Sequence, residues 1–266
     1  MNDEIDELLP KTQSRRTQDM NMKPVLLILG HLMGDENVRH PLFKDGLSQI
    51  LRQGVSHLNM MVETAMDIIQ MERLGQTAKK LSFKALETLM NFQQYFVQGL
   101  WVNDDPMMQL PGMDADEIKK YRKQLKDHQI PNGKIETFCR LSKEQRANLN
   151  LFDGNKAKLD QLEKVIANMP VVSVHQEILV EGEKMITAQD IITFKIWVQY
   201  ENLPENECPA YVHSENYPFL KKTNWYFVMV DEKTRERVIQ VERVQAKEGN
   251  KAMFEMKQRF GQAGKF

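Results

Sequence analysis

The sequence predicts an α+β multidomain protein in which helical parts precede a small β-sandwich. Apolar residues recur at three- and four-residue steps over most of the chain before residue 170, which is the spacing of amphipathic helices. After Pro170 they recur at every second residue, which is the spacing of β-strands. At 266 residues, with 41% hydrophobic and 27% charged side chains, the chain is long enough for more than one domain and has the composition of a folded protein.

Residues 1–105 are expected to form an N-terminal helical bundle. The apolar pattern predicts a helix over residues 41–75, which could be interrupted at Gly54. A second apolar pattern predicts a helix that begins after Ser82, whose hydroxyl can cap the first turn, and that closes near Trp101.

Residues 106–169 are expected to form a small helical, helix-hairpin-like subdomain. Pro106 lacks an amide donor and stops the preceding helix. Asp114 with Glu117 three positions later is the arrangement of a capping box and predicts a helix over residues 115–126. Further periodic stretches predict helices at residues 135–141, 143–149 and 156–169.

Residues 170–266 are expected to form a truncated sandwich of the immunoglobulin or fibronectin type III kind. A complete sandwich has about seven strands, so the closing strands are expected to be absent, which would leave a strand edge unpaired. The connection over residues 201–223 contains three prolines and is expected to be a packed crossing. The alternating pattern predicts strands at residues 172–180, 192–200, 225–230, 237–244 and 253–258.

The chain carries little that points to catalysis. Its six histidines are dispersed, and its two cysteines, Cys139 and Cys208, lie far apart outside any CxxC pair. Motifs for phosphate cradling and for a nucleophile elbow are missing from the sequence. We therefore expect no enzymatic activity, cofactor or metal. The longest apolar stretch, residues 25–33, is far shorter than the roughly 20 residues of a membrane span, so the chain itself is expected to be soluble and to face the cytosol.

Two groups of basic residues are candidate interaction surfaces. The first lies on the helix expected at residues 115–126 and could meet phosphate or an acidic partner, although a solvated helix face is the simpler interpretation. The second surrounds the third and fourth strands, where facing strands could bring it together as a basic rim that attracts an acidic partner. The groups are Lys119, Lys120, Arg122 and Lys123 on the helix, and Lys221, Lys222, Lys233, Arg235 and Arg237 on the strands.

The order of these parts, together with several short stretches, resembles the Sec-sixty-three (Brl) domain family, the cytosolic module of an endoplasmic-reticulum translocation J-protein. The resemblance covers the chain from about residue 20, and Leu110, Pro111, Trp225 and Phe227 are the family-motif positions for which it implies a structural role. The matching stretches are Gln98-Gly-Leu100, Met107-Met-Gln-Leu-Pro-Gly-Met-Asp114, Ile135-Glu-Thr-Phe-Cys-Arg-Leu141, Asn224-Trp-Tyr-Phe-Val-Met-Val-Asp231 and Phe260-Gly-Gln-Ala-Gly-Lys-Phe266.

This resemblance implies a non-catalytic auxiliary of the Sec translocon. The sandwich would dock on the cytosolic face of the channel and support post-translational import, and the full protein would be held at the endoplasmic-reticulum membrane by parts that this chain lacks. The sequence contains no His-Pro-Asp motif, so stimulation of a chaperone is not implied.

The same module also follows the motor domains of RNA and DNA helicases, including the spliceosomal one, where its helical part contacts nucleic acid. Lys119, Lys120, Arg122 and Lys123 would then be the contact residues. The formal net charge of −1 argues against this alternative, because nucleic-acid-binding domains usually have a basic excess, and the loop at residues 212–218 looks more like that of translocation proteins. A scaffold that binds another protein is a third alternative.

Overall fold

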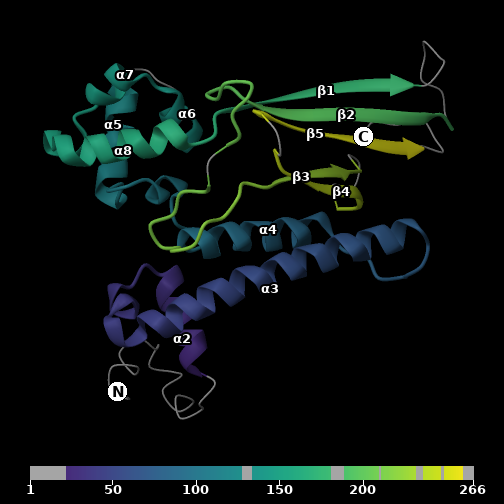
Figure 1. Ribbon diagram of the computed structural model, residues 1–266, viewed down its shortest axis with the longest axis horizontal. Helices are drawn as coiled ribbons and strands as arrows, with labels where there is room; N and C mark the ends of the chain where they lie inside the picture. Colours follow the sequence, from purple (N-terminus) through teal and green to yellow (C-terminus); the bar gives the residue numbers. More distant parts are fainter. Residues whose placement is uncertain are drawn as a thin grey trace.

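The computed structural model describes residues 22–127, 134–180, 189–209, 211–231, 236–246 and 249–259. It is a mixed α+β fold with helices and two small antiparallel sheets (Figure 1). The described elements are α2 (Met22–Leu32), η2 (Glu36–Arg39), α3 (Pro41–Arg73), α4 (Phe83–Gln98), η3 (Pro106–Gln109), α5 (Ala115–Asp127), α6 (Ile135–Arg140), α7 (Lys143–Ala147), η4 (Leu151–Gly154), α8 (Lys156–Asn168), β1 (Val172–Val180), β2 (Ile191–Tyr200), β3 (Trp225–Val230), β4 (Val238–Val244) and β5 (Lys251–Arg259).

The long helices α3 and α4 form an antiparallel pair (Figure 1). At the start of α4 the Ser82 hydroxyl accepts a hydrogen bond from the Ala85 amide, as expected of a cap. The helix is closed by Gly99, which has a left-handed conformation. Gly54 does not interrupt α3. A Cβ at residue 54 would lie 2.5 Å from Cζ of Phe96, so the glycine lets the Phe96 ring of α4 pack directly against the backbone of α3.

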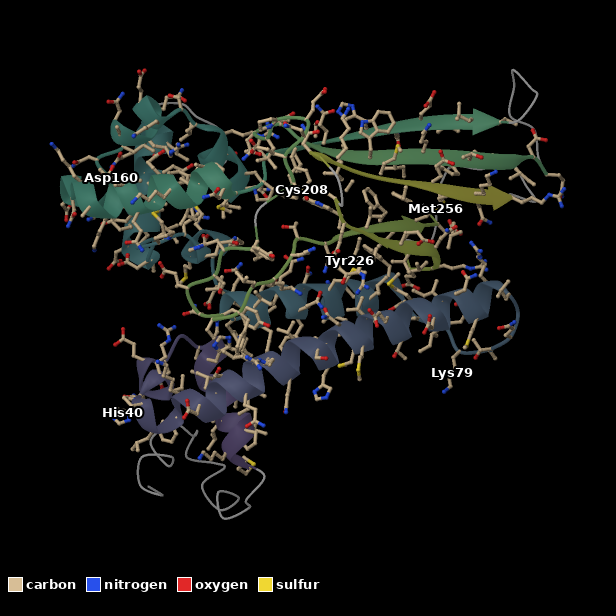
Figure 2. All side chains as sticks on the ribbon, in the orientation of Figure 1. His40, Lys79, Asp160, Cys208, Tyr226 and Met256 are labelled. Carbon is tan, nitrogen blue, oxygen red and sulfur yellow. The ribbon has the colours of Figure 1, made fainter. Side chains whose placement is uncertain are left out.

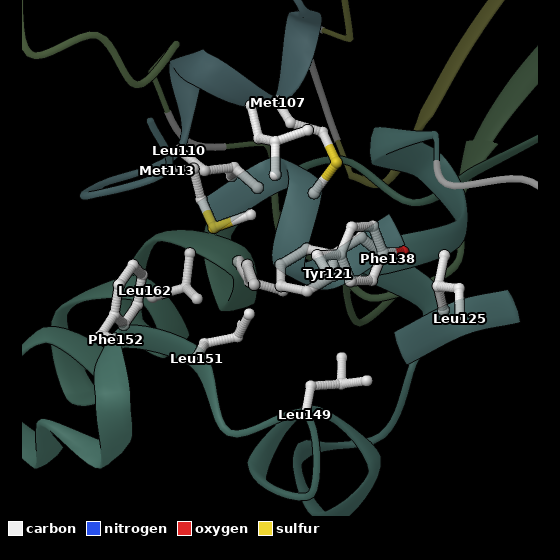
Figure 3. Packing of buried hydrophobic residues seen from close by; sticks show 12 residues of the cluster. Met107, Leu110, Met113, Tyr121, Leu125, Phe138, Leu149, Leu151, Phe152 and Leu162 are labelled. Carbon is white, nitrogen blue, oxygen red and sulfur yellow. The ribbon is translucent and has the colours of Figure 1, made fainter. Parts of the chain in front are cut away.

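The helices α5 to α8 have a hydrophobic core of their own (Figure 3). Its residues come entirely from the range 106–169, and Tyr121 packs edge-to-face on Phe138 with 4.9 Å between ring centroids. Asp114 caps α5 by accepting from the Glu117 amide at 2.9 Å. The second bond of the expected capping box, from the Asp114 backbone N–H to the Glu117 carboxylate, is not formed. That carboxylate accepts instead from Lys120 and from the Phe152 amide.

The strands lie in two antiparallel sheets, one in the order β1-β2-β5 and the other formed by the hairpin β3-β4. The sheets face each other through Phe227 and Phe254, whose ring centroids are 4.3 Å apart, and through a hydrogen bond from the Trp225 indole to the Tyr200 hydroxyl. All five expected strands are present within a residue or two of their expected bounds. Residues 260–266, where the resemblance expects the approach to the closing strands, lie outside the described residues.

The hairpin β3-β4 is a middle layer between the helices and the three-stranded sheet (Figure 1). Val228 and Val230 face the helices and contact a core that includes residues of α3, α4 and β4. Arg243 of β4 forms an ion pair with Glu63 of α3 at 2.8 Å, and the Phe83 amide donates to the Glu236 carbonyl at 2.7 Å. The first and third of the expected units therefore share a core, whereas the second has a separate one.

The second part of the connection expected at residues 201–223 packs on the helical layer, in agreement with the predicted packed crossing. The Ser214 hydroxyl donates to the Val97 carbonyl at 2.7 Å, and Nδ2 of the Asn216 side chain donates to the Gln98 carbonyl at 2.8 Å. The Arg52 guanidinium lies 4.5 Å from the ring centroid of Phe219. These bonds satisfy carbonyls at the C-terminal end of α4 that have no partner within the helix.

Candidate interaction surfaces

The expected basic rim is divided between the two ends of the hairpin. Lys221 and Lys222 precede β3, whereas Arg237 precedes β4 and pairs with Ser82. At about 3.3 Å per residue, the six residues of β3 separate these ends by about 20 Å. The structure thus contradicts the expected convergence of these three. Lys233 and Arg235 lie outside the described residues.

The two rim lysines differ in environment. Lys222 is exposed, whereas Lys221 is half-buried, and its burial, reinforced by the positive charge of Arg243, lowers the pKa of its ammonium group. Such burial favours an acidic partner, because a carboxylate would stabilise the charged form of the lysine.

Lys221 lines a pocket of about 390 Å³ at the start of β3. The pocket lies between α4, which contributes Met90, Gln93 and Gln94, and the stretch from Lys221 to Tyr226. Figure 2 labels Tyr226 on the hairpin beside α4, where its hydroxyl donates to Gln93 Oε1 at 3.4 Å. A second pocket of about 160 Å³ reaches the end of α8. Four of its lining residues also line the first pocket: Gln98, Gln109, Val212 and Thr223.

The four family-motif residues have structural positions. Trp225 lines the larger pocket, and Phe227 joins the two sheets. Leu110 is in the core of the α5–α8 subdomain, and Pro111 beside it is buried.

The basic face of α5 is largely paired with carboxylates. Lys119 bonds Asp116 at 3.1 Å, and Arg122 reaches Asp105 at 2.5 Å. Lys120 bonds both Glu117 and Asp153, and these hydrogen bonds raise the pKa of its ammonium group. Lys123 is exposed and forms no ion pair with a described residue. Phosphate binding here would compete with carboxylates already in place.

The structure describes the surroundings of several residues that could bind a metal ion or react as nucleophiles. No group of three or more histidine, cysteine, aspartate or glutamate residues is placed among the described residues to hold a metal ion. His31 is buried and bonds the Phe96 carbonyl at 2.8 Å, and its burial lowers the pKa of the imidazole. Burial likewise raises the pKa of the Cys139 thiol to about 11, which leaves little reactive thiolate at neutral pH.

Two features were missed by sequence reasoning. The amphipathic pattern does not identify α2, and the ion pair between buried Arg146 and Glu163, at 2.6 Å, joins residues that no motif connects. Within the part of the chain that the structure describes, no helix combines the length and apolar character needed to cross a membrane.

Comparison with known proteins relates the chain to J proteins. No family model matches it. It is similar to two DnaJ proteins of Arabidopsis thaliana: it is 30% identical to ERDJ2A and 27% identical to ERDJ2B, in each case over 128 residues. These matches cover 47% of this chain but only 18% of each relative. The similarity therefore concerns a limited part of a much longer protein.

Proposed function

We propose that the chain is a non-catalytic interaction module of an auxiliary subunit of the Sec translocon. It would dock on the cytosolic face of the channel and support post-translational protein translocation into the endoplasmic reticulum. The observation that carries this proposal is the similarity to two DnaJ proteins over nearly half of the chain, together with the family stretches that occur in order along the sequence.

The most suitable docking surface is the start of β3. It has a pocket that opens beside two lysines, one of them half-buried and one exposed. A cytosolic channel loop with acidic and apolar residues would complement both features, because partly desolvated charges discriminate strongly between partners of opposite sign.

The proposal is tested by co-purification. The tagged full chain is incubated with detergent-solubilised endoplasmic-reticulum membranes, and recovery of the Sec channel is measured by immunoblot. The wild-type chain should recover the channel, and Lys222→Glu should reduce recovery by about fivefold or more, in a salt-dependent way, since one reversed charge at a partly desolvated contact costs 1 kcal/mol or more.

The matched control is Lys79→Glu at the turn between α3 and α4, which Figure 2 shows far from Tyr226. Lys79 is also exposed, so the control makes the same change in net charge. Equal recovery with both variants would remove the lysine surface from the mechanism, and no recovery by the wild-type chain would contradict the translocation proposal.

The helicase alternative makes a different prediction for the full chain. It requires the chain to bind single-stranded RNA at low salt, with a steep loss of affinity as salt rises, and to lose binding on combined replacement of Lys119, Lys120, Arg122 and Lys123. Since three of these four residues already contact carboxylates, we expect no such binding.

A further inference from the structure

The strand β3 is wholly apolar, yet it contains no buried residue. Each of its six side chains, Trp-Tyr-Phe-Val-Met-Val, is of intermediate exposure. Tyr226 and Val228 face the helices, while Trp225 and Phe227 face the three-stranded sheet. Both faces of β3 are therefore covered in part, and we attribute the remaining exposure of its side chains to one open edge of the strand.

One edge of β3 pairs with β4, and within the described residues the other edge has no strand beside it. A free edge presents backbone N–H and C=O groups that another strand can bond. The larger pocket lies on this side, because it is lined by Trp225 and Tyr226 but by no residue of β4.

The three-stranded sheet extends beyond this free edge. Val174 and Ile178 of β1 point to the same face of the sheet as Val198, Ala252 and Met256, which are 1% exposed. Val174 and Ile178 are nevertheless 64% and 48% exposed. The hairpin covers β5 and the end of β2, and it is too narrow to cover β1. A surface of Val174 and Ile178, interrupted by the exposed Gln176 on the same face, thus overhangs the open edge of β3.

A second folded copy of the chain does not fit this groove. Two copies that paired through β3 would each bring a three-stranded sheet that overhangs the shared edge, and the two overhangs would occupy the same space. Neighbouring strands need only about 4.8 Å in the plane of a sheet, and facing sheets need about 10 Å. A single extended segment satisfies both spacings, because it can lie beside β3 in the plane of the hairpin and still face the three-stranded sheet.

We propose that the free edge of β3 accepts an extended segment of another protein as an added antiparallel strand. Its apolar side chains would alternate toward Val174 and Ile178, and its polar side chains would face the exposed Gln94 of α4. An antiparallel segment ends beside the start of β3, so an acidic residue after the apolar stretch would meet Lys222. This inference does not depend on the translocation proposal.

The first test uses a synthetic peptide, fluorescein-labelled Thr-Val-Thr-Ile-Thr-Val-Asp-Glu, and the full chain. Fluorescence anisotropy should show saturable binding. Two further peptides carry N-methyl groups on alternate residues, one on the odd and one on the even positions. Since only every second N–H faces β3, one methylated peptide should bind at least tenfold more weakly than the other. Equal affinities of the two, or no saturation of the unmethylated peptide at about 1 mM, would overturn the proposal.

The second test compares two substitutions in β1. Ile178→Lys places a charge in the groove and should weaken binding by about tenfold or more, because the apolar contact with the peptide is lost. Leu179→Lys is the matched control: Leu179 is 42% exposed and its side chain points to the opposite face, so affinity should be unchanged. Equal losses with both variants would refute the groove as the binding site.

A third measurement tests a second copy of the chain as the occupant of the edge. Sedimentation of the unliganded chain should give a monomer. A dimer that the peptide dissociates would show that a second copy occupies the edge and would overturn the proposal. Lys222→Glu should weaken binding of the acidic peptide and strengthen binding of the same peptide with Lys-Lys at its end.

Discussion

Replacing Gly54 by alanine should destabilise the protein, although alanine is the better helix former. In an exposed helix interior the change would stabilise by about 1 kcal/mol. Here the new Cβ would lie 2.5 Å from Cζ and 2.8 Å from Cε1 of Phe96, whereas carbon atoms pack at about 3.5–4.0 Å, so the ring must move by about 1 Å. Phe96 is 3% exposed and contacts His31. Overpacking of such a site costs about 1–3 kcal/mol, so the net loss is about 1 kcal/mol.

The assay is urea unfolding followed by far-ultraviolet circular dichroism. With a slope of about 2 kcal/mol per molar urea, the midpoint of Gly54→Ala should fall by about 0.5 M. Gly46→Ala, in the same helix, should raise it, because there a Cβ would meet only Leu27 at 3.9 Å. In a Phe96→Leu background the alanine at residue 54 should become stabilising. A midpoint of Gly54→Ala at or above that of the wild type would refute the close approach of α3 and α4.

Three further predictions concern Arg146, Tyr121 and the two cysteines. Arg146→Ala should cost about 3–5 kcal/mol of unfolding free energy, measured in urea, because it leaves the half-buried carboxylate of Glu163 without its partner; a loss below 1 kcal/mol would contradict this. Tyr121→Phe should be neutral or stabilising by about 1 kcal/mol, since the buried hydroxyl has no hydrogen-bond partner among the described residues. Burial raises the pKa of Tyr121 to about 12 from 10.0, so the wild-type chain should lose stability as the pH rises from about 10 toward 12, and the variant should lose less. Iodoacetamide at pH 8 should label the exposed Cys208 much faster than Cys139, whose thiol pKa burial raises to about 11; peptide mass mapping would show equal labelling if this is wrong.

The elements were predictable because their signals are local. Alternation placed β1 to β5 within a residue or two, and Ser82 marked the start of α4. The helix α2 was missed because residues 25–29 are continuously apolar, which hides any amphipathic period. The continuity of α3 through Gly54 depends on Phe96, a contact over 42 positions of sequence that no local pattern contains.

The candidate surfaces were less predictable, because they depend on contacts between distant parts of the chain. The carboxylates of Asp105 and Asp153 that bond the basic face of α5 come from outside that helix. The basic residues around the hairpin were expected to converge, but consecutive antiparallel strands begin at opposite ends, so Lys222 and Arg237 are separated. That β3 lies between two layers follows only from its pairing and packing.

The middle position of the hairpin has a consequence for synthesis on the ribosome. The faces of α3 and α4 that include Ile69 and Leu86 are covered by Val238 and Val241, which are translated roughly 150 residues later. At a translation rate of about 5–20 residues per second, these helix faces remain exposed for about 8–30 s before the residues that cover them are synthesised. A nascent chain that has completed both helices should therefore be recognised by chaperones that bind apolar segments, and it should be released once β4 has left the exit tunnel.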